Sequence, residues 1–252
     1  MFIFKKYNKG NLLIYSIYEF SKIKNNLLLI NNERYNINNY IIAEFDIKED
    51  NKKIRIINSY EQAKRENKYI EYKKEIENEK EIKDNCKIRI NDEFIPFSYF
   101  HKFNKKGNYT ILYIFKKNIT KTNYIFSGCS SLIKIDLSNF NTNNVTNMSD
   151  MFRGCSSLIN IDLSNFNTNN VTDISHMFYG CSSLINIDLS NFHTNNVTNM
   201  NGMFSGCSTL ININLSNFNT NNVKYMSWLF WACYILNKNN IITKDKRILN
   251  KC

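Results

Sequence analysis

A 26-residue repeat constrains this chain more than any other feature of its sequence. Cysteine recurs at a fixed step of 26 residues, at Cys129, Cys155, Cys181, Cys207 and Cys233. The unit between successive cysteines reads C-S-S-L-I-x-I-D-L-S-N-F-N-T-N-N-V-T-x-M-S-x-M-F-x-G, with few exceptions. A fixed period of this size is typical of repeat architectures, in which one unit alone cannot bury its apolar side chains. Such a chain presents a surface by repetition, whereas a catalytic centre usually needs unlike residues that converge once.

The second unit, residues 155–180, shows what each copy is expected to do. Its Leu-x-x-Ile-x-Leu segment has leucine-rich-repeat spacing, and the alternation across Ile161 and Leu163 predicts a short strand with both side chains inward. Residues 165–170 supply turn chemistry, because Asn tolerates left-handed backbone and bonds to its own main chain. Residues 175–180 are expected to form a short helical turn. The expected apolar ring consists of Leu158, Ile161, Leu163, Phe166, Val171, Ile174, Met177 and Phe178.

The repeat predicts an α/β solenoid, a leucine-rich-repeat stack of about four to five coils. Solenoids need atypical ends that cover their apolar edges. We therefore expect a β-rich N-terminal cap, a smaller α+β region before it, and a basic C-terminal cap. Trp228 and Trp231 are expected to form part of a terminal lid, with an aromatic binding patch as the alternative. The expected divisions are residues 1–85, 86–125, 126–236 and 237–252.

Residues 1–125 predict strands and one charged helix. A Ser59-Tyr-Glu-Gln sequence marks a helix start, and the Lys and Glu residues that follow suggest an exposed helix over 59–83. The pattern over 86–97, with a turn at Asn91-Asp92, predicts a hairpin, and 109–115 predicts a further strand. Apolar runs at 12–18, 27–30, 40–47 and 53–57 are strand-like, the first two less clearly than the others.

Equivalent residues of successive units should form rows along the stack. For the cysteine row, buried thiols are favoured over a metal or redox site, because no C-x-x-C spacing with a nearby His accompanies it. The second row is Asp136, Asp162, Asp188 and Asn214, expected to face outward. Like charges in register are destabilising. The row therefore indicates either a compensating partner or plain copying of the unit, with the charges screened by water. The candidate partners are a basic peptide, a cation, or the nearby Ser138, Ser164 and Ser190.

A third row follows the core leucines: Ile133, Ile159, Ile185 and Ile211. If these side chains are exposed, they form an apolar stripe of the kind that marks interaction sites. If they pack beneath a flanking segment, they belong to the core. The sequence leaves both alternatives open.

Charge and cysteine use limit the classes of partner and location. The formal net charge is +11, and the positive excess lies outside residues 126–236, where Asp outnumbers Lys and Arg. Basic residues could bind nucleic acid or an anionic surface through residues 1–125, but they are interleaved with Glu and Asp as on an ordinary solvated face. Neither a signal-peptide pattern nor a long apolar window is present. With seven cysteines and no disulfide framework, the chain is expected to be intracellular, in the cytoplasm.

The unit C-S-S-L-x-x-I-D-L-S-N-F-N-T-N-N-V-T-x-M-S-x-M-F resembles BspA-like leucine-rich repeats, including the mycoplasma-lipoprotein type, over about residues 126–236. This resemblance implies a right-handed leucine-rich solenoid that binds proteins. For bacterial members it implies adhesion to host proteins at the cell surface. The family motif contributes no catalytic residues.

The sequence therefore predicts a non-enzymatic scaffold that binds another protein. No phosphate-loop, dinucleotide, zinc-protease or nucleophile-elbow motif occurs. His176 and His193 stand at positions that vary between units, so they are poor catalytic candidates. We expect a monomer with no cofactor and no metal, whose partner contacts the Asp and Ile rows. The alternatives are a BspA-like surface adhesin and a nucleic-acid or anionic-surface binder that uses residues 1–125.

Overall fold

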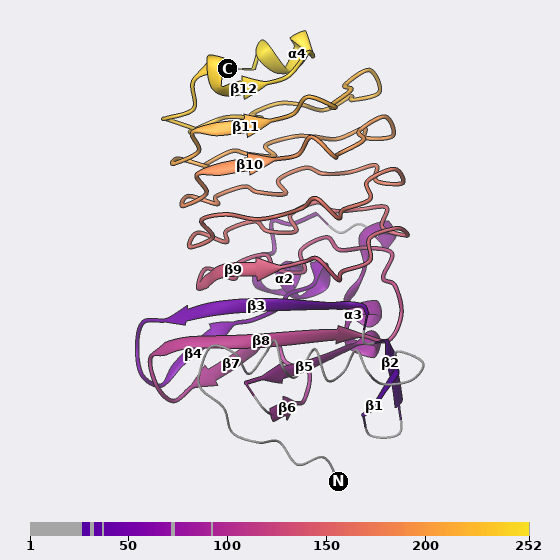
Figure 1. Ribbon diagram of the computed structural model, residues 1–252, viewed down its shortest axis with the longest axis vertical. Coiled ribbons are helices and arrows are strands. Elements are labelled where there is room, and N and C mark those ends of the chain that lie inside the picture. Colours follow the sequence, from indigo (N-terminus) through magenta and orange to yellow (C-terminus); the bar gives the residue numbers. More distant parts are fainter. Residues whose placement is uncertain (1–26, 31–32, 37, 72–73, 92, 252) are drawn as a thin grey trace.

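The computed structural model describes residues 27–251, apart from 31–32, 37, 72–73 and 92. The strand expected at 12–18 lies outside the described residues. Figure 1 shows the N-terminal sheets gathered at one end of the molecule, with the repeats following one another along its long axis to helix α4. None of the helices in the described part of the chain has the length and apolar character needed to cross a bilayer.

Strands and turns dominate the described chain, and its helices are short. The helices are α2 (Tyr60–Glu66), α3 (Glu79–Asn85) and α4 (Lys246–Leu249), with 3-10 turns η1 (Lys74–Ile76) and η2 (Lys238–Asn240). The strands are β1 (Leu27–Ile30), β2 (Glu33–Asn36), β3 (Tyr40–Ile47), β4 (Lys52–Arg55), β5 (Cys86–Ile90), β6 (Glu93–Ile95), β7 (Phe100–Phe103), β8 (Gly107–Phe115), β9 (Leu132–Asp136), β10 (Asn186–Asp188), β11 (Asn212–Asn214) and β12 (Ile241–Ile242).

A five-stranded antiparallel sheet in the order β6-β5-β8-β3-β9 organises the N-terminal part. Burial alternates strictly along β3, because successive side chains of a strand point to opposite faces. The strand predicted at 40–47 is confirmed, and so is the hairpin of β5 and β6. Strands β4 and β7 form a separate antiparallel pair, as do β1 and β2.

The junction between this sheet and the repeats differs from the expected cap. Residues 86–125 were expected to cover the first repeat, but β3 lies between β8 and the first repeat strand, β9. Ala43 of β3 pairs with Ile135 of β9, so the sheet crosses both expected boundaries, at 85 and at 125. Sequence order could not reveal this arrangement, because β3 reaches β9 across about ninety residues of chain.

The single helix expected over 59–83 is also wrong. Ser59 does cap α2, accepting a hydrogen bond from the Gln62 N–H at 3.1 Å, as the sequence predicted. The helix then ends at Asn67, whose backbone is extended (φ −128°, ψ 97°). A second helix, α3, begins only after Asn78. Arg65 of α2 pairs with Glu79 of α3, and Lys83 pairs with the same Glu79 within α3, so the ion pairs do not follow one continuous helix.

The expected α/β leucine-rich-repeat solenoid is not what forms. Residues 126–236 contain no helix, and the described strands divide among separate sheets instead of one parallel ladder. The first repeat strand belongs to the antiparallel sheet, whereas β10, β11 and β12 form a small parallel sheet of their own. The second repeat has no strand at 161–163, although Ile161 and Leu163 are buried as expected.

Left-handed residues explain why the repeats lack a helix. His176 (φ 54°) and Gly180 (φ 70°) interrupt the segment expected to form a helical turn, and Asp150 and Trp228 adopt the same conformation in their own repeats. A right-handed helix cannot pass through such a residue. The segment is instead a series of turns. Each turn is held by a hydrogen bond from an N–H to the carbonyl three residues earlier, such as Tyr179 N–H to His176 O at 3.0 Å.

Backbone hydrogen bonds and stacked rings join successive repeats. In each repeat, alternate backbone N–H groups donate to carbonyl groups of the next repeat. Examples are Phe152 N–H to Met177 O and Phe178 N–H to Met203 O, both at 2.9 Å. The predicted apolar ring is entirely buried and joins one core that runs from β3 to α4. Near-parallel phenylalanine rings stack along this core with centroids 5.7–5.9 Å apart, at Phe126, Phe152, Phe178, Phe204 and Phe230.

Candidate interaction surface

The cysteine row lies in the core and bonds one repeat to the previous one. The thiol of Cys181 donates to Phe152 O at 3.2 Å, and that of Cys207 donates to Phe178 O at 3.1 Å. Burial raises the pKa of the Cys129 and Cys181 thiols to about 12. Thiols of this kind are protonated at neutral pH and unreactive. Cys155 makes the equivalent contact with Phe126 O, and Cys233, which is only partly buried, with Phe204 O.

In the row of Asp136, Asp162, Asp188 and Asn214, each side chain bonds the nearby serine, which is one of the partners that the sequence suggested. In each, Oδ1 accepts a hydrogen bond from the backbone N–H of the serine two residues later, at 2.8–3.1 Å. For Asp162 this bond, with the Ser164 hydroxyl, lowers the pKa of the carboxyl. The three Asp side chains are exposed, and Asn214 is half-buried. The carboxylates therefore serve the turn and still present charge to solvent.

The isoleucine row is partly exposed, which resolves the alternative left open by the sequence. Ile159 is 45% exposed and Ile211 is 39% exposed. Ile133 and Ile185 are half-buried. Backbone bonds join three of them directly, from Ile185 N–H to Ile159 O and from Ile211 N–H to Ile185 O. We call the Ile row and the Asp row together the strand face.

Asparagine and threonine side chains form further rows, in addition to the turn role predicted for residues 165–170. Thr168 is buried, and its hydroxyl accepts from His193 N–H at 2.8 Å and donates to His193 O at 3.3 Å. Asn170 Nδ2 donates to Asn143 O in the previous repeat, and Asn196 does the same to Asn169 O. These Asn and Thr residues recur strictly at the 26-residue period, and this recurrence is the sequence signal for their roles. Counting Asn and Thr over the whole chain does not reveal it.

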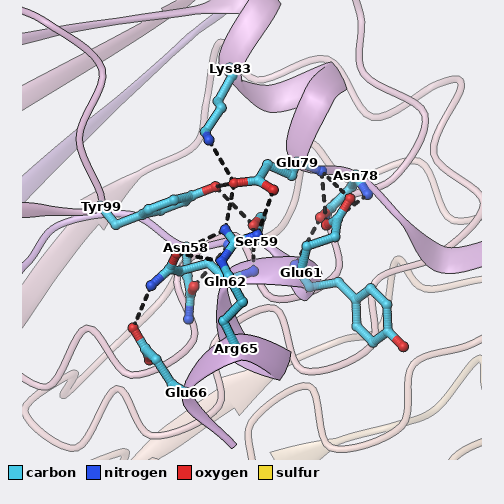
Figure 2. Close-up of polar contacts among 11 residues, drawn as sticks. Asn58, Ser59, Glu61, Gln62, Arg65, Glu66, Asn78, Glu79, Lys83 and Tyr99 are labelled. Carbon is cyan, nitrogen blue, oxygen red and sulfur yellow. Dashed lines mark hydrogen bonds and ion pairs between the residues drawn. The ribbon is translucent and has the colours of Figure 1, made fainter. Parts of the chain in front are cut away.

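A polar cluster fixes α2 against α3 near the first repeat (Figure 2). The Glu79 carboxylate accepts two hydrogen bonds from the Arg65 guanidinium, at 2.6 and 2.9 Å, and one from the Tyr99 hydroxyl. Together with Lys83, at 2.7 Å, these donors lower the pKa of Glu79 to about 2, with Arg65 the largest contributor. A carboxylate held this firmly as an anion is a structural centre and a poor proton acceptor.

A second cluster of titratable groups lies on the turn side of the repeats. Asp150 is buried and paired with Arg153 at 3.0 Å, and burial raises the pKa of its carboxyl to about 6. Arg153 also lies over the ring of Tyr179, 4.3 Å from its centroid. Burial, followed by the nearby Arg153, lowers the pKa of His176. No group of three or more His, Cys, Asp or Glu within the described ranges could hold a metal ion.

An exposed aromatic patch occupies the last repeat. Trp228 is 69% exposed and Trp231 is 61% exposed, so neither acts as the terminal lid that we expected. They occupy the positions that Asp150 and Arg153 occupy three repeats earlier, on the turn side. We call this set of five exposed side chains the terminal aromatic patch: Tyr225, Trp228, Trp231, Tyr234 and Ile235.

These features define a repeat protein, whose chemistry is distributed over rows of equivalent side chains. Residues 97–210 and residues 158–247 each match the family described as "Mycoplasma protein of unknown function, DUF285". The two matches overlap and together span more than half of the chain, so the chain belongs to this family. A search of curated proteins found no match. A search of solved structures found none either.

Proposed function

We propose that this protein is a non-enzymatic interaction module that binds a protein partner through the strand face. One observation carries the proposal: the exposed apolar side chain of Ile159 lies three residues before the outward carboxylate of Asp162, and Ile211 continues the apolar row two repeats later. Exposed apolar side chains bordered by polar groups are typical of protein interaction sites. An acidic and apolar stripe of this kind suits a partner segment that carries basic and apolar side chains.

The chemistry of the Asp row supports such a partner. One oxygen of each carboxylate is used in the local turn, while the second makes no hydrogen bond to any described residue. The serine bond keeps Asp162 ionised, because it lowers the pKa of that carboxyl. A Lys or Arg of the partner could therefore pair with the second oxygen without unfolding the turn.

Affinity capture with a charge-changing pair of variants tests the proposal. The double variant Ile159→Ser/Asp162→Asn removes one apolar contact and one negative charge. Asn at position 162 can keep the turn bond, because Asn214 makes that bond in the fourth repeat. We expect proteins captured by the wild type to be lost from this variant, as measured by quantitative mass spectrometry of the bound fraction.

Asn144→Glu supplies the matched control, because Asn144 is exposed and lies on a turn away from the strand face. This variant should capture the same proteins as the wild type. Equal capture by all three proteins would exclude the strand face as the binding site.

The narrower assignment to BspA-like leucine-rich repeats is part of this proposal and is supported by the repeat unit itself. We also place the protein inside the cell, a location favoured by its free and mostly buried thiols. Fractionation of cells followed by detection of the tagged protein tests the location. Recovery of the protein from the cell surface would support the adhesin alternative instead.

A further inference from the structure

The two ends of the repeat region differ in how their backbone groups are satisfied. At the N-terminal end, two asparagines cover three of the four carbonyl groups that would face a preceding repeat. Asn78 Nδ2 donates to Asn123 O at 2.6 Å. The Asn58 N–H donates to Ile125 O at 2.8 Å, and its side chain donates to Ser127 O at 2.9 Å. This end is closed.

The C-terminal end is closed on only one side. There β12 pairs with β11, and the Asp245 carboxylate accepts from Thr220 N–H at 2.9 Å and from its hydroxyl at 2.6 Å. Arg247 donates to Val223 O at 2.9 Å and to Thr220 O. These contacts replace those that a further repeat would make to this part of the last one.

The turn side of the last repeat has no such cover. In the preceding interface, alternate N–H groups donate to Tyr225 O, Ser227 O, Leu229 O and Trp231 O, at 2.7–3.0 Å. The equivalent N–H groups one repeat later make no hydrogen bond to any described residue. They therefore leave a row of four unused backbone donors. These donors are the N–H groups of Met226, Trp228, Phe230 and Ala232.

Apolar and basic side chains surround this open row. The terminal aromatic patch is exposed around it, and a pocket of about 380 Å³ is lined by Phe230, Cys233, Leu236, Asn237, Lys238 and Lys251. Beyond Lys224, the described chain carries one acidic residue, Asp245, and that carboxylate already binds Thr220. The surface is therefore rich in backbone donors, aromatic rings and positive charge.

The arrangement of donors and acceptors excludes a second copy as the occupant. Head-to-tail pairing would need open carbonyl groups at Asn123, Ile125 and Ser127, but Asn58 and Asn78 occupy them. Tail-to-tail pairing would place N–H groups against N–H groups and Lys against Lys, which is repulsive. The occupant must bring carbonyl oxygens and negative charge.

We propose that the open row at the C-terminal end is a docking site for an acidic segment of another protein, which adds its backbone as the next repeat would. Addition of a peptide to an exposed backbone edge is a common recognition mode, in which main-chain bonds give affinity and side-chain contacts give specificity. Here the carbonyl groups of alternate partner residues would accept from the four N–H groups, and Trp228 and Trp231 would pack on the side chains between them. This site is independent of the strand face.

A peptide of the chain's own acceptor segment serves as the probe. The probe is a fluorescein-labelled peptide copying residues 171–181, with blocked ends and the change Cys181→Ser. It carries one acid, Asp173, and the carbonyl groups of Asp173, Ser175, Met177 and Tyr179, which in the protein accept from the row of backbone donors in the previous repeat. We expect saturable binding to the full-length protein by fluorescence anisotropy. A peptide with Asp173→Lys should bind about tenfold more weakly, and the difference should shrink as salt rises.

Two protein variants and one structural readout decide between outcomes. Trp228→Ala/Trp231→Ala should weaken binding about tenfold or more, as expected for aromatic residues at a binding site, and should stay folded because both rings are exposed. Ile159→Glu should bind the peptide normally, which separates this site from the strand face. Hydrogen exchange at the amides of Met226, Trp228, Phe230 and Ala232 should slow when the peptide is bound.

Each contrary result overturns the proposal. Absence of saturable binding, or binding without slower exchange at these amides, would show that the row is not a docking edge. Protection at the strand face instead would assign the peptide to the other site. Dimerisation of the protein alone in analytical ultracentrifugation, abolished by Trp228→Ala/Trp231→Ala, would show that a second copy is the occupant.

Discussion

At the scale of single residues, many repeated polar side chains form hydrogen bonds to the backbone of the repeats, and some of them are also exposed on its surface. Asp162 illustrates both, because its carboxylate caps a turn through Ser164 N–H and still lies exposed. Thr168 and Asn170 likewise bond the main chain of neighbouring repeats. Residues that recur at the period therefore need a structural explanation before a functional one.

The turn role of Asp162 predicts different results for two substitutions. Asp162→Asn should leave the free energy of unfolding within about 0.5 kcal/mol of the wild type, because Asn214 makes the same bond in its repeat. Asp162→Ala removes the acceptor and should lower it by about 1 kcal/mol. Urea denaturation followed by circular dichroism measures both. Equal destabilisation by the two variants would show that charge, and not the turn bond, is what matters.

The buried cysteine row predicts a pattern of thiol reactivity. In a Cys252→Ser background, Cys233 should react first with a disulfide reagent, because it is only partly buried. The fully buried thiols should react only when urea unfolds the chain, since burial keeps them protonated. Absorbance during labelling in native buffer and in urea gives the two rates. Rapid labelling of the whole row in native buffer would contradict the buried placement.

At the scale of elements, the two short helices are fixed by one shared polar cluster. Glu61 accepts the N–H groups of Asn78 and Glu79, so α2 caps the start of α3. Arg65 of α2 then pairs with Glu79 of α3. The sequence revealed the cap at Ser59 but not this cluster, because its members become neighbours only when the chain folds back between residues 67 and 78.

The cluster predicts a pH dependence of stability. The folded pKa of Glu79, about 2, lies below the ordinary value of 4.5, so its stabilising contribution is present above about pH 4.5. It is lost progressively as the pH falls from 4.5 toward 2. Glu79→Gln should be less stable than the wild type by about 1 kcal/mol at pH 7, since solvent screens part of the interaction. Urea titrations between pH 3 and pH 7 should show this difference shrinking toward acid, and a constant difference would contradict the argument.

At the scale of the whole molecule, the repeats form one continuous core between unequal ends. The N-terminal sheet covers the first repeat through β3 and through Asn58, whereas the last repeat is closed by Asp245 and Arg247 on one side only. Repeat proteins depend on interactions between neighbouring units, so loss of a terminal contact is felt mostly by the adjacent unit.

This dependence predicts that the repeat region frays from its C-terminal end. Asp245→Ala should lower the free energy of opening the last repeat by about 1–2 kcal/mol, because the Thr220 N–H and hydroxyl lose a charged acceptor. Hydrogen exchange should then become about tenfold faster over residues 215–232 and stay unchanged in β3 and β8. Lys244→Ala, at an exposed neighbouring position, is the control. Uniform acceleration over the whole chain would indicate global destabilisation instead.

The sequence by itself determined the repeat, its buried apolar ring, the outward Asp positions and several strands, because each depends on local periodicity that one unit already contains. It misled on the fold class, since leucine-rich spacing does not reveal that residues such as His176 adopt left-handed backbone and break a helix. Only the tertiary structure decided that β3 joins the first repeat, that Asn58 and Asn78 close one end, and that Trp228 and Trp231 remain exposed at the other. These outcomes depend on contacts between distant segments, whose backbone donors and acceptors are matched only after folding.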